Sequence, residues 1–203
     1  FEVSLFAGDE LAHDIHSMTT DHHGRIVVGG KGWVKILHDS DGDGNAEQAT
    51  VFTEYPRSGA QGLYFDEQGL VVSGDQGVRR WRDTDGDGKA DGEPELLIRT
   101  ERDGEHTAHA IVKGPDGWLY LIAGNNTGIT SEHVKLPGSP VQQVITGVIV
   151  RFLPDGRSSE VIAHGFRNPY DFDFHPLGHL LTYDSDGERD HHLPWWTGTR
   201  IFD

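Results

Sequence analysis

The chain has 203 residues, including 27 glycines and 9 prolines, and it contains no cysteine. Without cysteine it cannot form a disulfide scaffold, a thiolate zinc site, a cysteine nucleophile or a covalently attached c-type haem. Its formal net charge of −16 argues against nucleic-acid binding, which needs clustered lysine and arginine. No apolar run is long enough for a membrane span, so none is predicted.

The predicted strands form a repeated unit. A turn glycine followed by strand-forming residues occurs at 24–28, 69–72, 117–121 and 178–182. A second, half-apolar strand precedes each glycine, at 15–19, 62–65, 110–113 and 170–174. The glycines are separated by 45, 48 and 61 residues, and the longest interval contains a proline-bearing loop at 129–145. A period of this size without helical periodicity is typical of propeller blades, whereas a sandwich does not explain the repetition.

We therefore predict an all-β fold, a β-propeller of four-stranded blades. The length accommodates about four blades, within a single partial propeller domain covering residues 1–203.

Two acidic loops, at 39–47 and 83–91, are near copies and lie 44 residues apart. Calcium prefers several oxygen ligands, which alternating aspartates can supply while the glycines allow a tight turn. The predicted ligands are Asp39, Asp41, Asp43, the Asn45 carbonyl and Glu47 in one loop, and Asp83, Asp85, Asp87, the Lys89 carbonyl and Asp91 in the other. An EF-hand is excluded because its twelfth position is Thr50 or Pro94 in place of glutamate. Such sites suit the calcium of a periplasmic or extracellular location.

A candidate functional ring follows from the repeat. Counting back eleven residues from each turn glycine gives His13, Ser58, His106 and Arg167. If the blades superpose, these residues begin equivalent strands and gather at one face of the central channel. The alternatives are polar strand edges without a role, and a transition-metal site among the several histidines, although no pair has the compact His-Glu-x-x-His spacing. No nucleotide-binding or phosphate-binding fingerprint is present.

Two segments carry a family resemblance. Residues 106–120, which run from His106 to Gly-Pro-Asp-Gly-Trp-Leu-Tyr, resemble the strand that bears the catalytic histidine in soluble pyrroloquinoline-quinone (PQQ) glucose dehydrogenases. The segment 165–169, Gly-Phe-Arg-Asn-Pro, resembles their quinone-contacting Arg-Asn-Pro segment. The whole chain is still more similar to the dehydrogenase-like propellers of planctomycete-type proteins, which are related to sorbosone dehydrogenases and often fused to cytochrome c modules.

The resemblance implies the roles of individual residues. His106 would be the general base and Arg167 would stabilise charge on the quinone, which Asn168 would also contact. Asp186 and Gly187 would lie at a calcium ion beside the quinone. His13 joins the cofactor-binding residues through its place in the ring.

The implied activity is PQQ-dependent oxidation of a sugar, sugar aldehyde or alcohol, with calcium as a second cofactor and a cytochrome c-type electron acceptor. The resemblance also implies six blades in the complete domain, so that remaining blades or a partner chain would close the propeller. Two alternatives stay open: a non-catalytic propeller that binds a glycan or protein, and a calcium-dependent lactonase.

Overall fold

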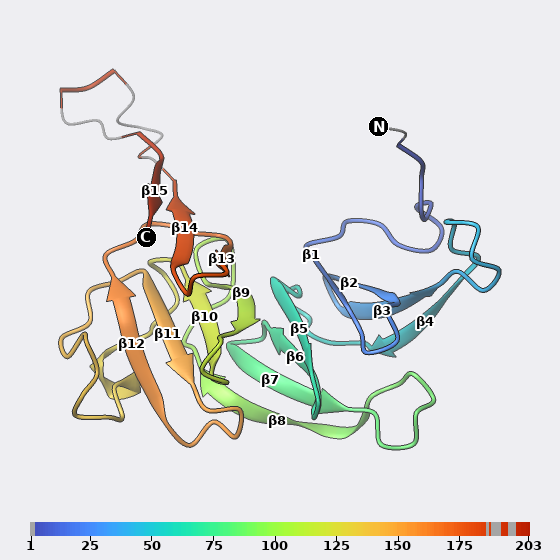
Figure 1. The fold of residues 1–203 in the computed structure, drawn as a ribbon, viewed down its shortest axis with the longest axis horizontal. Coiled ribbons are helices and arrows are strands. Elements are labelled where there is room, and N and C mark those ends of the chain that lie inside the picture. The colour runs from blue at the N-terminus through green and yellow to red at the C-terminus, as the bar shows by residue number, and fades with distance from the viewer. Residues whose placement is uncertain (1–2, 186, 188–191, 195–197) are drawn as a thin grey trace. The chain divides into compact units, whose positions relative to one another are not determined.

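The computed structural model describes residues 3–185, 187, 192–194 and 198–203, and these residues are almost entirely β-structure (Figure 1). The chain divides into two compact units, one ending at Leu96 and the other beginning at Leu97. Each unit is built from antiparallel sheets whose strands follow one another in chain order.

The first unit holds two four-stranded sheets. The first sheet has the order β1 (Ser17–Thr20), β2 (Ile26–Gly30), β3 (Trp33–His38), β4 (Gln48–Thr53). The second has the order β5 (Gly62–Asp66), β6 (Gly69–Ser73), β7 (Gly77–Arg82), β8 (Asp91–Arg99), with the end of β8 passing into the second unit. Each sheet is a meander in which every strand pairs with the next one, as in a propeller blade.

Alternation along the strands explains why the two sheets pack face to face. Val27 joins a core cluster with residues of both sheets, which are Val34, Ile36, Phe52, Ala60, Leu63, Leu70, Val72 and Trp81. Its neighbour Val28 points to the opposite face and packs with Ala12 and Leu37. Successive strand residues face opposite sides, so the central strands β2 and β3 of the first sheet are buried on both faces. Gly29 permits the contact, because a Cβ there would lie 2.6 Å from the Cβ of Ala60.

The second unit holds a four-stranded sheet and a shorter one. The first has the order β12 (Ser159–His164), β11 (Val148–Phe152), β10 (Leu119–Ala123), β9 (Ala108–Lys113). A 3₁₀ turn, η1 (Ser131–His133), interrupts the long connection between β10 and β11. Within the described residues the last sheet has three strands, β13 (Phe172–Phe174), β14 (Leu180–Asp184) and β15 (Arg200–Phe202). Tyr120, Ile122, Ile149, Phe166 and Phe172 form a core cluster of this unit.

The predicted fold class is confirmed: the chain is all-β and is built from the blades of a β-propeller, of which three have four strands and the last has three described strands. The runs after the four turn glycines are β2, β6, β10 and β14. The outer strands β4, β8 and β12 were not predicted individually.

The prediction that the four ring residues begin strands is wrong. His13 and Ser58 each lie four residues before a strand, and His106 and Arg167 lie two and five residues before theirs. The physical reason is visible in the second unit, where loop residues bind the backbone at these positions. The His106 carbonyl accepts from Asn126 N and the Arg167 carbonyl accepts from Asn125 N, each at 2.8 Å.

Candidate functional site

His106 and Arg167 meet around the loop that follows β10. The backbone N–H of Asn125 donates to the carbonyl of Arg167 at 2.8 Å. The side-chain Oδ1 of the same asparagine lies 2.9 Å from Nδ1 of His106. A Cβ at Gly124 would lie 2.7 Å from Asn168 Oδ1 and 2.8 Å from the carbonyl carbon of His106. The loop therefore joins the two sequence-predicted segments, and Gly124 allows their close approach.

The contact with Asn125 defines the chemistry available to His106. An amide oxygen can only accept a hydrogen bond, so Nδ1 of His106 is the donor. In the neutral ring the other nitrogen, Nε2, then carries the lone pair and can take up a proton. The sequence reasoning missed Asn125. The signal was a polar residue two positions beyond the end of the fully buried strand β10.

Asp184 fixes the backbone of the Arg167-Asn168 pair. Its carboxylate accepts from Arg167 N at 2.7 Å, from Asn168 N at 2.8 Å and from Ser185 N at 2.9 Å. The Arg167 guanidinium donates to Ser185 Oγ at 2.7 Å. Hydrogen bonds to a charged carboxylate are among the stronger ones in proteins, so this arrangement holds the pair in place.

A cavity of about 260 Å³ adjoins the Arg167 side chain, and its lining includes Asp184, Gly187 and Arg200. Its lining carries two arginines against one aspartate, and an arginine can bind a ligand carboxylate. Gly187, one of the two predicted residues of the quinone loop, is therefore beside Arg167. The other, Asp186, lies outside the described residues.

A fully buried histidine, His109, holds the Asn168 side chain. Its Nε2 lies 2.9 Å from Asn168 Oδ1, and its ring is 4.8 Å from the ring of Tyr170. Burial lowers the pKa of His109 below its ordinary value, because the charged imidazolium is poorly solvated there. Burial outweighs the hydrogen bonds to Asn168 and to the Glu105 backbone, both of which raise that pKa. The ring is therefore neutral near pH 7.

His13 lies in the first unit. It is exposed, its Nδ1 is 3.1 Å from Asp14 Oδ2, and its ring is 6.2 Å from that of Trp33. Its predicted contact with a cofactor stays a prediction.

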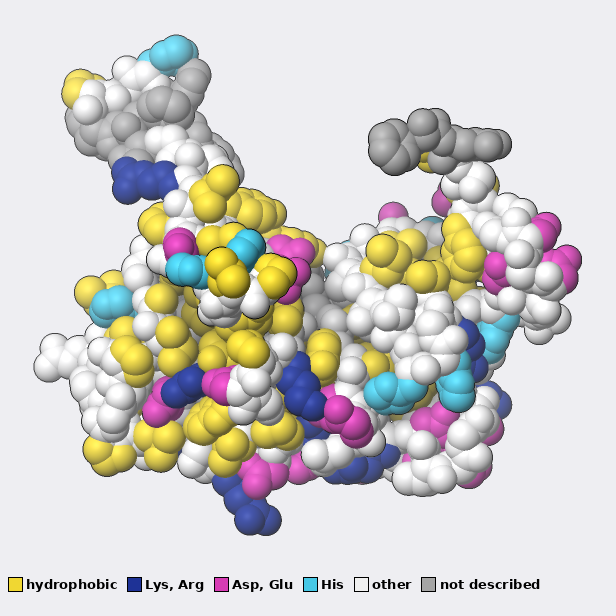
Figure 2. Space-filling view, in the orientation of Figure 1, with side chains coloured by type: hydrophobic (Ala, Val, Ile, Leu, Met, Phe, Trp, Pro, Cys, Tyr) yellow, Lys and Arg dark blue, Asp and Glu magenta, His cyan; other side chains and the backbone are white. Residues whose placement is uncertain are grey.

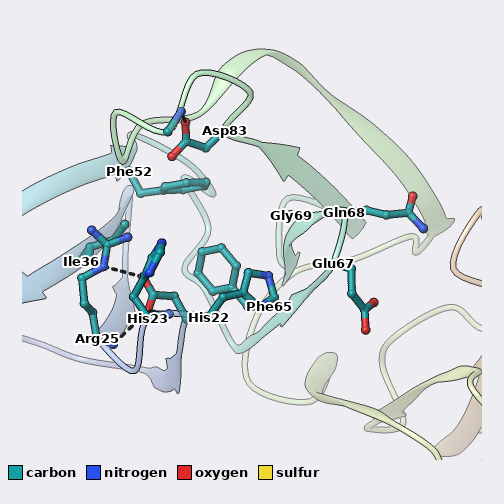
Figure 3. A pocket seen from close by; sticks show the side chains of 12 residues that line it. His22, His23, Arg25, Ile36, Phe52, Phe65, Glu67, Gln68, Gly69 and Asp83 are labelled. Atoms are coloured by element: carbon teal, nitrogen blue, oxygen red, sulfur yellow. Dashed lines mark hydrogen bonds and ion pairs between the residues drawn. The ribbon is translucent and has the colours of Figure 1, made fainter.

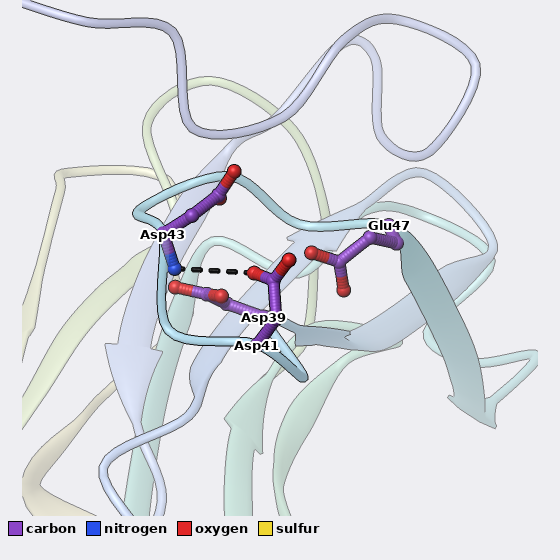
Figure 4. Close-up of side chains that lie close together, drawn as sticks. All are labelled: Asp39, Asp41, Asp43 and Glu47. Carbon is purple, nitrogen blue, oxygen red and sulfur yellow. Dashed lines mark hydrogen bonds between the residues drawn. The ribbon is translucent and has the colours of Figure 1, made fainter.

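The first acidic loop brings its carboxylates together, as Figure 4 shows for all four side chains. Ligand oxygens of Asp39, Asp41, Asp43 and Glu47 lie within 4.8 Å of one another. Asp39 accepts from the backbone of Gly42 and Gly44, both of which have positive φ angles that favour glycine. A set of four converging carboxylates suits a hard cation such as calcium.

The second acidic loop repeats this geometry with one difference. Asp83 accepts from Gly86 N and Gly88 N at 2.8 and 2.9 Å. Here the converging oxygens belong to Asp83, Asp85 and Asp91. Asp87 is outside that group, and its carboxylate accepts from Lys89 N at 2.8 Å. The carbonyl ligands predicted at Asn45 and Lys89 stay predictions.

Thr84 binds the last carboxylate of this loop. Hydrogen bonds from the Thr84 hydroxyl and from its backbone lower the pKa of Asp91. The lowered pKa keeps Asp91 ionised, as a calcium ligand must be. Acidic side chains gather over both loops in the space-filling view (Figure 2).

No histidine metal centre is found among the residues that the structure describes, since the two groups of metal-binding side chains are these acidic loops.

A second cavity, of about 230 Å³, lies within the first unit (Figure 3). His22, Phe52, Phe65 and Asp83 are among its lining residues. The rings of Phe52 and Phe65 meet edge to face at 5.9 Å, and His22 Nε2 is 2.7 Å from the Asp66 carbonyl. Because Phe52, Phe65 and His22 are already engaged in contacts with neighbouring protein groups, we interpret the cavity as a packing gap between the two sheets of the first unit. No sequence motif indicated this cavity.

The profile of a domain of unknown function, DUF7133, matches residues 1–194. A search of curated proteins finds no match. Solved structures with the same fold include the holo PQQ domain of pyranose dehydrogenase from Coprinopsis cinerea (14% identity, TM-score 0.63) and a PQQ-bound aldose sugar dehydrogenase from Streptomyces coelicolor (17%, 0.57). A structural-genomics target described as a gluconolactonase also matches (18%, 0.54).

These matches cover 85%, 87% and 88% of this chain but only 44%, 57% and 58% of those structures. The chain thus spans about half the length of the structures that it matches. At such low identity the likeness shows the fold alone, here that of PQQ-dehydrogenase-like propellers. Among the described residues, no helix has the length and apolar character needed to cross a membrane.

Proposed function

The chain belongs to the DUF7133 family, and we propose that it forms part of a propeller enzyme that oxidises a sugar, sugar aldehyde or alcohol with PQQ as cofactor. The observation that carries the proposal is the cluster at Asn125, where His106 meets the Arg167-Asn168 pair. Asn125 joins the two segments through the ring of His106 and the backbone carbonyl of Arg167, so a base, a cation and an amide lie on adjoining segments. Removal of a proton and a hydride from an alcohol requires these three groups. The fold shared with PQQ-bound dehydrogenases supports the same reading.

In this proposal each residue has a distinct task. His106, with Nδ1 bound to Asn125, accepts the proton of the substrate hydroxyl at Nε2. Bound PQQ would accept the hydride from the substrate carbon that carries this hydroxyl. Arg167 stabilises negative charge on the cofactor, and Asn168 donates to it through its amide. Asp184 keeps the pair in place through its bonds to the backbone.

We also propose calcium for the two acidic loops, where it would neutralise carboxylates that repel one another. Asp186 and Gly187 are proposed at a further calcium ion near the quinone, supported by the position of Gly187 beside Arg167. The proposed location is periplasmic or extracellular, where calcium is abundant. A cytochrome c-type electron acceptor stays a proposal without structural support.

A lactonase is the second candidate, because a protein described as a gluconolactonase shares the fold. A calcium-dependent lactonase needs several carboxylates around an axial ion. The described cluster at His106 presents an imidazole and amides, which favours the oxidoreductase. A non-catalytic role in binding a glycan or protein remains the third candidate, and activity measurements separate it from both.

The test uses the full-length protein with calcium. PQQ is titrated calorimetrically, and its reduction by a panel of aldoses and alcohols is followed by absorbance. We expect one PQQ per chain and a reduction rate that falls at least about a hundredfold in His106→Gln, the usual loss on removing a general base.

His175→Phe is the control, since this exposed histidine of the second unit flanks the turn after β13 and has no task in the proposed mechanism. Absence of PQQ binding, or an undiminished rate in His106→Gln, would overturn the proposal. Hydrolysis of aldonolactones without PQQ reduction would favour the lactonase.

A further inference from the structure

We propose that His109 is a positioning residue that sets which atom of the Asn168 amide faces the cofactor. This inference rests on the proposed function, because it assumes that Asn168 contacts PQQ. His109 itself belongs to neither the sequence-predicted site nor the mechanism above.

The first step concerns the contact. Nε2 of His109 and Oδ1 of Asn168 are 2.9 Å apart. The amide oxygen accepts, so Nε2 of the histidine must carry the proton. An asparagine whose oxygen is engaged in this way directs its amino group elsewhere, because the two atoms diverge from the same carbon. The arrangement thus leaves Nδ2 to donate to a carbonyl or carboxylate oxygen of the ligand.

The second step concerns rigidity. Only 1% of the surface of His109 is exposed, and its ring is tilted by 41° against the ring of Tyr170. The residue lies on β9, next to the buried Ala108. A buried ring that packs against the Tyr170 ring has little freedom to rotate, so its N–H bond has a fixed direction. A supporting residue of this kind keeps a binding group close to its productive orientation.

The third step concerns the need for such a partner. The backbone of Asn168 is already fixed, because Asp184 accepts from its N–H. The side-chain amide could still rotate by half a turn and exchange its oxygen and amino group. With its proton on Nε2, His109 removes that ambiguity, because Nε2–H accepts no bond from an amino group. A ring with its proton on Nδ1, bound to the Glu105 backbone, would hold the amide in the opposite orientation. The peptide and the amide are therefore fixed by two different residues.

The experiment measures PQQ affinity by calorimetry in the full-length protein with calcium. His109→Phe keeps an aromatic ring but loses the donor, and we expect affinity to fall about tenfold, as for the loss of one hydrogen bond. His109→Gln restores an N–H donor near the same place and should recover most of that loss. His175→Phe serves as the matched exchange at an exposed histidine and should bind PQQ like the wild type.

A double mutant separates positioning from a general structural effect. In an Asn168→Ala background, His109→Phe should change the PQQ affinity by less than about twofold, since its effect passes through the missing amide. An equal loss in both backgrounds, or wild-type affinity in His109→Phe, would overturn the inference.

Nitrogen NMR of the His109 ring gives a readout that needs no cofactor. We expect a protonated Nε2 and an unprotonated Nδ1. A proton on Nδ1 would reverse the amide and overturn the inference, even if PQQ binds. If the wild type binds no PQQ while the ring carries its proton on Nε2, the proposed function fails and the geometric part of the inference survives.

Discussion

At the scale of single residues, the site depends on polar side chains that follow buried strands. Asn125 comes directly after Gly124 at the end of β10, and Asp184 is the last residue of β14. Each of them binds backbone atoms or side chains from a different segment of the second unit. A strand buried by the core places such a residue firmly, which is why one asparagine can join His106 to Arg167.

The buried His109 makes a prediction for pH. Its pKa in the folded chain is lower than the value near 6.5 of an exposed histidine. As pH falls below 6.5, the unfolded chain therefore binds a proton before the folded chain does, and the free energy of unfolding decreases. Above 6.5 this contribution is constant.

We expect urea unfolding to show a steeper loss of stability between pH 7 and pH 5 in the wild type than in His109→Gln, which has no titrating group at this position. Parallel pH profiles of the two proteins would contradict the assignment of a lowered pKa to His109.

Only some of the residues that form the candidate site could be predicted from the sequence. The eleven-residue offset picked out His106 and Arg167, which both precede the first strand of a blade in the second unit, and both contact Asn125. Their shared functional role stays a prediction. The offset could not predict Asn125 or Asp184, since an isolated Asn or Asp beyond a strand is common in turns. Nor could it predict His109, whose partner Asn168 is 59 residues away. Long-range contacts of this kind depend on how the sheets pack.

At the scale of elements, the loop after β10 makes a prediction at Gly124. Its φ angle is not positive, so the requirement for glycine comes from space alone. A Cβ would lie 2.7 Å from Asn168 Oδ1, closer than ordinary contact. Gly124→Ala should therefore destabilise the chain by about 1 to 3 kcal/mol, the usual cost of overpacking, and push His106 away from Asn168.

Gly138→Ala is the matched control, since no atom lies within 4 Å of the Cβ position there and its φ angle is also not positive. Denaturant unfolding measures both variants. A similar small effect for the two would show that the segments around Gly124 separate easily.

The acidic loops make the second prediction at this scale. If calcium binds them, ligand linkage should stabilise the fold by about 2.7 kcal/mol per site at a hundredfold excess over Kd. Chelation should therefore lower the melting temperature. Asp85→Asn should reduce that calcium effect more than Asp87→Asn does, because the Asp85 carboxylate converges with Asp83 and Asp91 while that of Asp87 does not.

Asp87→Asn also controls for the loss of charge, since each of the two substitutions removes one carboxylate from the same loop. An unchanged melting curve in excess chelator would refute calcium binding. Equal effects of the two substitutions would instead return Asp87 to the ligand set, as the sequence predicted.

At the scale of the whole molecule, the repeat was the strongest sequence signal, because strand, turn glycine and strand recur four times. The outer strands were harder to predict. β8 begins with Asp-Gly-Glu-Pro, a pattern that reads as a turn, and it becomes a strand because the sheet supplies a partner edge. The sequence therefore predicts the repeated blade, whereas the start of its outer strand depends on pairing within the folded sheet.

The last sheet presents an apolar edge. Ile201 on β15 is 82% exposed, and Tyr183 and Leu181 on β14 are 45% and 37% exposed. Hydrophobic side chains gather over these two strands in Figure 2. A cavity of about 400 Å³, lined largely by apolar residues such as Ile149, Leu180 and Phe202, adjoins them. Among the described residues β15 is an edge strand of this sheet, and edge strands pair readily with other strands.

We therefore expect the 203-residue chain, produced by itself, to self-associate through β15. Ile201→Lys places a charge on that edge, and natural proteins use lysine there to prevent strand pairing, so self-association should weaken by about tenfold or more. Leu177→Lys is the matched control, because Leu177 is 80% exposed in the same unit but lies in a turn between β13 and β14, where it offers no strand edge. Sedimentation velocity over a concentration series measures the three proteins. If the wild-type chain stays monomeric, or if Ile201→Lys and Leu177→Lys weaken self-association equally, then the chain does not associate through the β15 edge. If only Ile201→Lys dissociates the chain, β15 is the edge through which copies of this chain associate.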